Sequence, residues 1–224
     1  MPARATASGR PRCFVSPRLG ARRMVLLSVG VLLLAACGGP EPAPGPGTVM
    51  GFAPSLMGQR VMVLPVQSNL GVRGDPDAEL AFGLHERDVE VEWVMPAEVQ
   101  EVLDRSPGVR TRLNGLAVGQ FLVAEVRRIG DPLYGQLRRL AALVDAQVAL
   151  VPVQVALATE DSGAAQSAPT EPTVRVWTAL IDIRTGRVQW FSIVDGEAFP
   201  VGDPRGLASA METMTRTLLW YSDT

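Results

Sequence analysis

Cys37 is the residue whose thiol and position in the sequence together indicate a covalent modification. It follows Leu34-Ala35-Ala36 and ends an apolar stretch of 13 residues, 24–36. A signal peptidase site requires small side chains, which Ala35 and Ala36 supply, and the thiol is the one side chain here that can take a thioether-linked lipid. The spacing therefore predicts cleavage between Ala36 and Cys37 and lipidation of Cys37.

The segment before Cys37 has the pattern of an export signal. Six arginines and no acidic residue precede the apolar stretch, and a positive segment followed by a short apolar one is typical of such signals. With 13 residues the stretch is shorter than the roughly 20 that span a bilayer, which disfavours a transmembrane helix. The pattern resembles a bacterial lipoprotein signal; the alternative is an ordinary cleaved signal with an incidental cysteine.

The resemblance to lipoprotein signals implies an anchor and an address. Lipoproteins of this class carry several acyl chains, palmitate among them, and several chains anchor durably because each buried methylene contributes about 0.8 kcal/mol. Residue 38 is Gly and not Asp, and in this class an Asp there tends to hold the protein at the inner membrane. The resemblance therefore implies the outer membrane, on its periplasmic side. Arg22-Arg23 leaves Sec and twin-arginine export both open.

Charge and cysteine content limit what the remaining chain can do. Removing the six leader arginines from the total of 21 leaves 15 against 23 acidic residues, a net charge of −8. Such a charge argues against nucleic acid or an anionic membrane surface as a partner. The other cysteine, Cys13, lies in the leader, so after lipidation of Cys37 no thiol remains for a disulfide, a zinc site or a nucleophile.

Patterns typical of catalytic and metal sites are missing from the sequence. His85 is the only histidine, no Gly-x-Ser-x-Gly accompanies it, and a place at a helix end or on the surface suits it better. Asp75, Asp77 and Glu79 cluster without the spacing of an EF-hand, and charges at a helix start explain them better. We therefore expect no enzyme, with no catalytic, cofactor-binding or metal-binding residues. A carboxylate pair acting as an envelope hydrolase is the weaker alternative.

Composition divides the chain into three parts. Residues 1–36 form the signal peptide, residues 37–51 are a Pro/Gly-rich tether, and residues 52–224 are long enough for a single globular domain. Within that domain, apolar runs and alternation predict strands at 60–67, 89–93, 147–157, 174–183 and 188–194. Residues 159–172, small and polar, are expected to form a flexible hairpin loop.

Helices are predicted between these strands from their caps and apolar spacing. They cover a short helix capped by Asp77, a helix opened by Pro96, a helix over 116–129, one starting at Asp131-Pro132, and a last one capped by Asp203-Pro204. The expected fold class is α/β of the α+β type. It has a single mixed sheet, an antiparallel C-terminal hairpin region, and helices packed against the sheet. Trp93 and Trp190 are expected in the core, whereas Trp220-Tyr221 closes the core or faces a partner.

Three segments resemble a known superfamily. They are RVMVLPVQ (60–67), LAALVDAQVALVPVQV (140–155) and TALIDIRTGRVQWF (178–191), and the last contains Asp182-x-x-Thr185-Gly186-x-x-x-Trp190. Together they are similar to envelope lipoproteins and periplasmic domains that include the TolB N-terminal domain, the curli secretion subunit, lipoprotein activators of penicillin-binding proteins, and ring-forming exopolysaccharide-export lipoproteins. The resemblance implies a scaffold or adaptor and carries no catalytic residue across.

Two functions follow from these expectations. The first is a non-enzymatic lipoprotein that faces the periplasm and acts as an assembly or accessory subunit in envelope biogenesis or export, alone or as a homo-oligomeric ring. The second is a regulatory or binding module, such as an activator of a cell-wall synthase. In both cases the expected partners are the membrane, which is contacted through the lipid on Cys37, and envelope proteins that are not identified.

Overall fold

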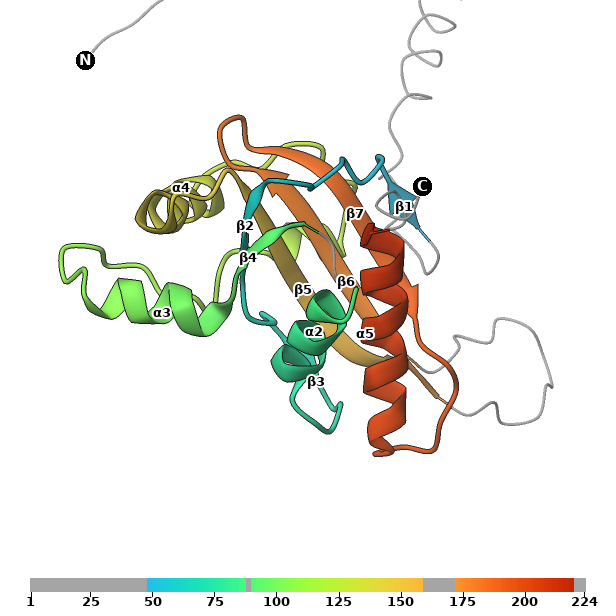
Figure 1. Ribbon diagram of the computed structural model, residues 1–224. Coiled ribbons are helices and arrows are strands. Elements are labelled where there is room, and N and C mark those ends of the chain that lie inside the picture. The colour runs from blue at the N-terminus through green and yellow to red at the C-terminus, as the bar shows by residue number, and fades with distance from the viewer. Residues whose placement is uncertain (1–47, 88–89, 159–171, 220–224) are drawn as a thin grey trace, which may run out of the picture. The chain divides into compact units, whose positions relative to one another are not determined.

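A seven-stranded mixed sheet forms the centre of the fold (Figure 1). The computed structural model describes residues 48–87, 90–158 and 172–219. The strand order is β1-β7-β6-β5-β2-β4, and β3 pairs with β5 beside this path. The strands are β1 (Val49–Met50), β2 (Arg60–Val63), β3 (Asn69–Leu70), β4 (Glu92–Val94), β5 (Val148–Ala158), β6 (Thr173–Asp182) and β7 (Arg187–Asp195).

Four α-helices pack on this sheet. They are α2 (Pro76–His85), α3 (Pro96–Asp104), α4 (Leu133–Val144) and α5 (Pro204–Leu219), and a 3₁₀ helix, η1, covers Gly119–Leu122. The strand β2 is parallel to β4 and β5, whereas β5, β6, β7 and β1 pair antiparallel in turn. The predicted α+β class with an antiparallel C-terminal region is therefore confirmed.

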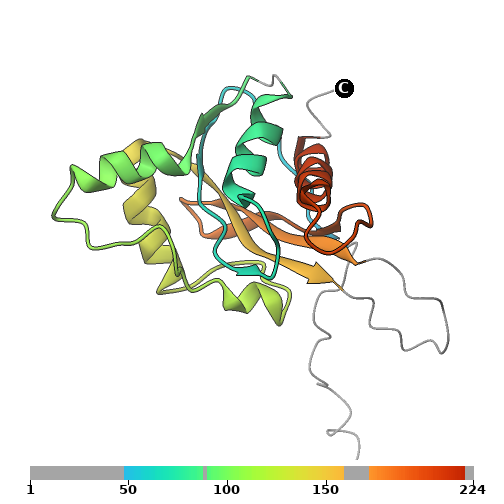
Figure 2. The ribbon, with the colours of Figure 1, turned by 90° about the horizontal axis from the view of Figure 1, so that it is seen from below.

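Helices cover both faces of the sheet (Figure 2). On one face, α3 and α4 pack on side chains such as Met62, Ala149 and Ile181. On the other face, α2 and α5 pack on Val61, Leu150, Trp190 and their neighbours. Burial on both faces explains why the central strands read as nearly continuous apolar runs.

Two β-bulges redirect side chains within the long strands. The register between β5 and β6 shifts at Val153, and that between β6 and β7 shifts at Gln189. Val151 and Val153 lie in one core cluster, as alternation requires, whereas Val155, beyond the bulge, lies in the cluster on the other face. An extra residue changes the face of everything beyond it, because side chains alternate along a strand.

The turn between β6 and β7 has the geometry that its motif predicts. The Asp182 carboxylate accepts a hydrogen bond from Thr185 N at 2.8 Å, and its carbonyl accepts one from Gly186 N at 2.8 Å. Gly186 has φ +70° and lies against the Tyr134 ring of α4. Glycine is favoured there because a Cβ atom is costly in the left-handed region.

The helix predicted over 116–129 is wrong. The structure has only the short η1 there, and the rest of the segment is irregular. Its backbone instead bonds to other parts of the fold: Ile129 N donates to Gly186 O at 2.8 Å, and Leu116 N donates to the Gln67 side chain at 3.0 Å. The apolar residues of the segment, Phe121 among them, fill the core beside α4. Tertiary packing overrides the local helical pattern here.

The start of α2 is also corrected. Asp75, and not Asp77, is the N-cap, and its carboxylate accepts hydrogen bonds from Asp77 N and Ala78 N at 3.1 Å each. Asp77 instead accepts a hydrogen bond from Val66 N at 2.7 Å, beyond the end of β2. The helices opened by Pro96 and by Asp203-Pro204 are confirmed, and the helix after Asp131-Pro132 forms with Pro132, and not Asp131, as its N-cap.

Other expectations concern residues outside the described ranges. These are the signal peptide, most of the tether, the 159–172 loop apart from Pro172, and Trp220-Tyr221. The end of the predicted tether is described, and Val49–Met50 pairs there with β7 as β1. The strands on either side of the 159–172 segment pair antiparallel, as a hairpin requires. Within the described ranges, the helices are too short or too polar for one of them to cross a membrane.

Candidate functional site

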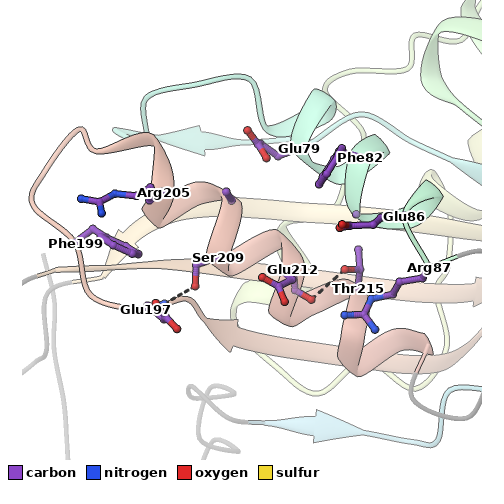
Figure 3. A pocket seen from close by; sticks show the side chains of 12 residues that line it. Glu79, Phe82, Glu86, Arg87, Glu197, Phe199, Arg205, Ser209, Glu212 and Thr215 are labelled. Atoms are coloured by element: carbon purple, nitrogen blue, oxygen red, sulfur yellow. Dashed lines mark hydrogen bonds between the residues drawn. The ribbon is translucent and has the colours of Figure 1, made fainter. Parts of the chain in front are cut away.

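A groove between α2 and α5 is the best-formed candidate site (Figure 3). It has a volume of about 310 Å³, and its walls come from α2, from α5 and from the segment that leads into α5. The lining residues are Glu79, Phe82, Gly83, Glu86, Arg87, Glu197, Phe199, Arg205, Ala208, Ser209, Glu212 and Thr215.

Apolar packing beneath the groove holds its two helices together. Leu80 and Leu84 of α2 and Leu207, Met211 and Met214 of α5 are buried in one core cluster above the sheet. The residues Glu79, Phe82, Gly83 and Glu86 recur at helical spacing on a stripe that adjoins the core stripe of α2. The core stripe and the groove stripe therefore follow from one helical period, and burial of the first determines where the second lies.

The segment 196–203 closes one end of the groove and is fixed to α5. Glu197 N donates a hydrogen bond to Ser209 Oγ at 2.9 Å (Figure 3). Gly196 lies so close to α5 that an added Cβ atom would be 2.7 Å from Ala210 N. Only glycine permits this approach, since contacts under 3.0 Å force the backbone to shift.

A guanidinium already sits on an aromatic ring at this end. Arg205 lies 4.7 Å from the centre of the Phe199 ring, and its Nη2 atom is 2.6 Å from Asp203 Oδ2. The hydrogen bonds from Arg205 lower the pKa of Asp203. At this end of the groove, Arg205 thus contacts both an aromatic ring and the carboxylate of Asp203, which lies outside the lining.

The remaining charge of the groove is acidic. Four glutamates, Glu79, Glu86, Glu197 and Glu212, line it against two arginines. The ion pairs found among the described residues involve other acids, and Arg205 is paired with Asp203. Between Glu79 of α2 and Glu86, which follows the last residue of α2, Phe82 is 64% exposed. An exposed phenylalanine beside a concave surface indicates a binding site more strongly than one on an open surface does.

The groove lining lacks the parts of a nucleophilic site. It contains no histidine or cysteine, and Ser209 Oγ accepts a hydrogen bond from backbone. Among the described residues, no group of three His, Cys, Asp or Glu side chains could hold a metal ion. The arrangement of exposed carboxylates around an aromatic ring is suited to binding a positively charged group.

The residues that the sequence singled out are mostly elsewhere. Ala36 and Cys37 lie outside the described residues, so cleavage and lipidation stay predictions. His85 is exposed at the end of α2, where its Nδ1 atom lies 2.7 Å from Ala81 O, as expected of a helix-end histidine. Of the acidic cluster, Asp75 and Asp77 have the structural roles described above, and only Glu79 lines the groove.

Trp93 and Trp190 pack in the core, as predicted. Trp190 is buried, and Trp93 is partly buried against the same core cluster. Trp177 is partly buried on the opposite face, and Arg175 lies 5.9 Å from its ring centre. Phe82 was not among the predicted site residues. The signal that could have found it is its spacing from Glu79 and Glu86, which places an aromatic ring in an acidic stripe.

Comparisons with known proteins identify no family. No protein family model and no curated protein matches the sequence. Similar solved structures include the LpoB C-terminal domain from Salmonella enterica, with 14% identity and a TM-score of 0.37 over 74% of this chain and 90% of that one.

Two further solved structures have comparable similarity. The PelC dodecamer from Paraburkholderia phytofirmans has 16% identity and a TM-score of 0.35, over 77% of this chain and 94% of that one. Lipoprotein GNA1162 from Neisseria meningitidis has 15% identity and a TM-score of 0.37, over 74% and 99%.

The similar structures thus include a named lipoprotein. The narrower relationship to the TolB N-terminal domain and the curli secretion subunit is not confirmed. Identities and TM-scores this low carry no conclusion about the function of this chain.

Proposed function

We propose that this protein is a non-enzymatic lipoprotein, anchored to the outer membrane through Cys37, that serves as an accessory or assembly subunit for envelope proteins. The observation that carries the proposal is the sequence Leu34-Ala35-Ala36-Cys37 at the end of a short apolar stretch. A Pro/Gly-rich segment separates this cysteine from the folded residues, and it gives the body reach from the membrane surface.

Two properties of the folded part support work through contacts. The groove between α2 and α5 exposes an aromatic ring and carboxylates without a nucleophile and base held together. The rest of the sheet is covered on both faces by helices and buried side chains. We include in this proposal a relationship to TolB-like envelope domains, which rests on the sequence resemblance described above.

Metabolic labelling with a radioactive fatty acid tests the anchor. The wild-type chain is expected to take up label and to fractionate with the outer membrane, and Cys37→Ser is expected to lose the label and leave the membrane fraction. Cys13→Ser is the matched control, since it removes the other thiol but keeps the predicted lipidation site. Label retained by Cys37→Ser would contradict the proposal.

The address is tested by a single substitution after the lipidated residue. Residue 38 is Gly, and Gly38→Asp is expected to move the labelled protein to the inner membrane on a density gradient. Gly39→Asp, which adds the same charge one position later, serves as the control. Labelled wild-type protein in the inner-membrane fraction would overturn the assignment to the outer membrane.

A regulatory module, such as an activator of a cell-wall synthase, is the second candidate. The observation that favours it is the α2–α5 groove, which can receive a partner segment without any reaction at the site. Addition of the purified chain is then expected to raise the rate of a reconstituted synthase. No stimulation at saturating concentration would favour the assembly role instead.

A further inference from the structure

The α2–α5 groove combines an apolar floor with an acidic rim. Phe82, Gly83, Ala208 and Phe199 contribute apolar surface to the lining, and the glutamates lie around it. Figure 3 shows Glu79, Phe82 and Glu86 along α2, with Glu212 on α5. The two walls therefore present carboxylates to any chain that lies between them.

The spacing on α2 defines how a cation would be held. Glu79 and Glu86 are each about one helical turn, roughly 5 Å along the axis, from Phe82. A guanidinium or ammonium placed over the exposed Phe82 ring would have a carboxylate on either side of it. The neighbouring Arg205, between Phe199 and Asp203, shows the same arrangement made within the chain itself.

We propose that the α2–α5 groove is a docking site for a cationic segment of a partner protein, in which arginine or lysine side chains flank an apolar one. The apolar side chain would pack on the groove floor beside Phe82 and Ala208, and the cationic ones would meet Glu79, Glu86 and Glu212. The inference rests on the proposed function, since it supplies the chemistry of the contact that an accessory subunit makes.

Charge excludes other kinds of occupant. An anionic ligand would meet four glutamates against Arg87 and the already paired Arg205. A wholly apolar segment would take carboxylates out of water without a partner, which is costly. A volume of about 310 Å³ is at the small end of binding pockets. It therefore fits one or two side chains of a longer segment.

A peptide titration tests the groove directly. The probe is a synthetic nine-residue peptide in which arginines alternate with leucines, added to the full-length chain in detergent and followed by calorimetry and by NMR of labelled phenylalanine. Saturable binding with a shift of the Phe82 ring signals is expected. The same peptide with glutamate in place of each arginine is expected not to bind.

Matched variants separate the groove from overall charge. Glu79→Gln with Glu86→Gln is expected to weaken binding about tenfold, and Phe82→Ala to weaken it about threefold to tenfold. Glu90→Gln with Asp104→Asn removes the same charge at exposed residues that do not line the groove, and less than about a twofold change is expected. Because Phe82 is 64% exposed, Phe82→Ala should keep its thermal unfolding midpoint.

Three results would overturn the proposal. The first is unchanged peptide affinity in the groove variants, and the second is an equal loss of affinity in the control pair. The third is groove variants that dissociate a homo-oligomer without changing peptide binding. The last would assign the groove to a second copy of the chain. Failure of fatty acid labelling would remove the anchor but leave peptide binding measurable, so the two proposals fail separately.

Discussion

Gly83 of α2 lies against Thr215 of α5, at the point where the two walls of the groove meet. A Cβ atom at position 83 would be 3.0 Å from Thr215 Cγ2 and 3.1 Å from Thr215 Oγ1. Thr215 is fully buried, and its hydroxyl donates to Glu212 O at 3.0 Å, which holds the side chain in place. The missing side chain at Gly83 therefore determines how closely α2 approaches α5.

Gly83→Val is expected to lower the free energy of unfolding by about 1–3 kcal/mol, because the branched side chain cannot enter this contact without moving α2. Urea unfolding measures the change. Thr215→Ala removes the obstructing atoms, so the double variant is expected to lose at least about 0.5 kcal/mol less than the sum of the single variants. Simple additivity would contradict the contact.

Gly186→Ala is expected to cost about 1–2 kcal/mol from backbone conformation alone, since Gly186 has φ +70°. The new methyl group would also be 3.1 Å from Tyr134 Cδ2, which adds to the loss. Gly108→Ala is the matched control, because no atom lies within 4 Å of its Cβ position. A change within about 0.5 kcal/mol is expected there. Equal unfolding midpoints for both variants would refute the prediction.

Asp77 makes stability depend on pH in an unusual direction. Burial raises the pKa of Asp77, the hydrogen bond from Val66 N lowers it, and the nearby Asp75 charge raises it again, with a net rise. The folded state therefore holds the proton more tightly than the unfolded state. The stabilisation due to this group is present below the unfolded pKa, about 3.9, and is lost as the pH rises through the folded pKa.

Asp77→Asn keeps an oxygen that can accept from Val66 N but removes the charge. The variant is expected to be more stable than the wild type at pH 7, with the difference shrinking as the pH falls towards 4. Urea unfolding across this range measures it. Asp77→Ala, which leaves Val66 N without this acceptor, is expected to be less stable than Asp77→Asn throughout. A difference that grows on acidification would show the opposite sign.

Gln67 fixes the irregular segment that replaces the predicted helix. Its Nε2 atom donates to Leu113 O at 2.9 Å, and its Oε1 atom accepts from Leu116 N at 3.0 Å. Gln67→Leu is expected to cost about 1–3 kcal/mol, because it leaves these backbone groups unpaired. It should also speed hydrogen exchange at the Leu116 amide. Gln100→Leu, at an exposed position of α3, should change neither quantity by much. Unchanged hydrogen exchange at Leu116 in Gln67→Leu would disprove the role of Gln67.

Local patterns predicted much of this protein because local physics controls those parts. The apolar period of α4, with Leu133, Leu137, Leu140 and Val144, predicts its buried face. The motif from Asp182 to Gly186 predicts a turn, since its hydrogen bonds lie within five residues. The apolar runs predicted the central strands for the same reason, although the bulges at Val153 and Gln189 gave no signal in the sequence.

The start of α2 shows where local reading fails. Both Asp75 and Asp77 are residues that cap helices, and sequence spacing alone does not separate them. The Asp77 side chain accepts a hydrogen bond from Val66 N, eleven residues earlier in the chain. This contact depends on how α2 packs in the fold and not on the residues next to Asp77. Gln67 acts over a longer range still, and it outweighs a helical pattern in the 116–129 segment.

The sequence by itself determined the five longer strands, four of the helices, the turn motif and the predicted lipid anchor, because each depends on neighbours along the chain. It did not predict the two-residue strands β1 and β3. Only the tertiary structure decided the pairing of α2 with α5 and therefore the groove. Its acids come from Glu79 and Glu86 on one helix and from Glu197 and Glu212 more than a hundred residues later. The close contact of Gly83 with Thr215 joins these segments, and packing on the same face of the sheet places them side by side.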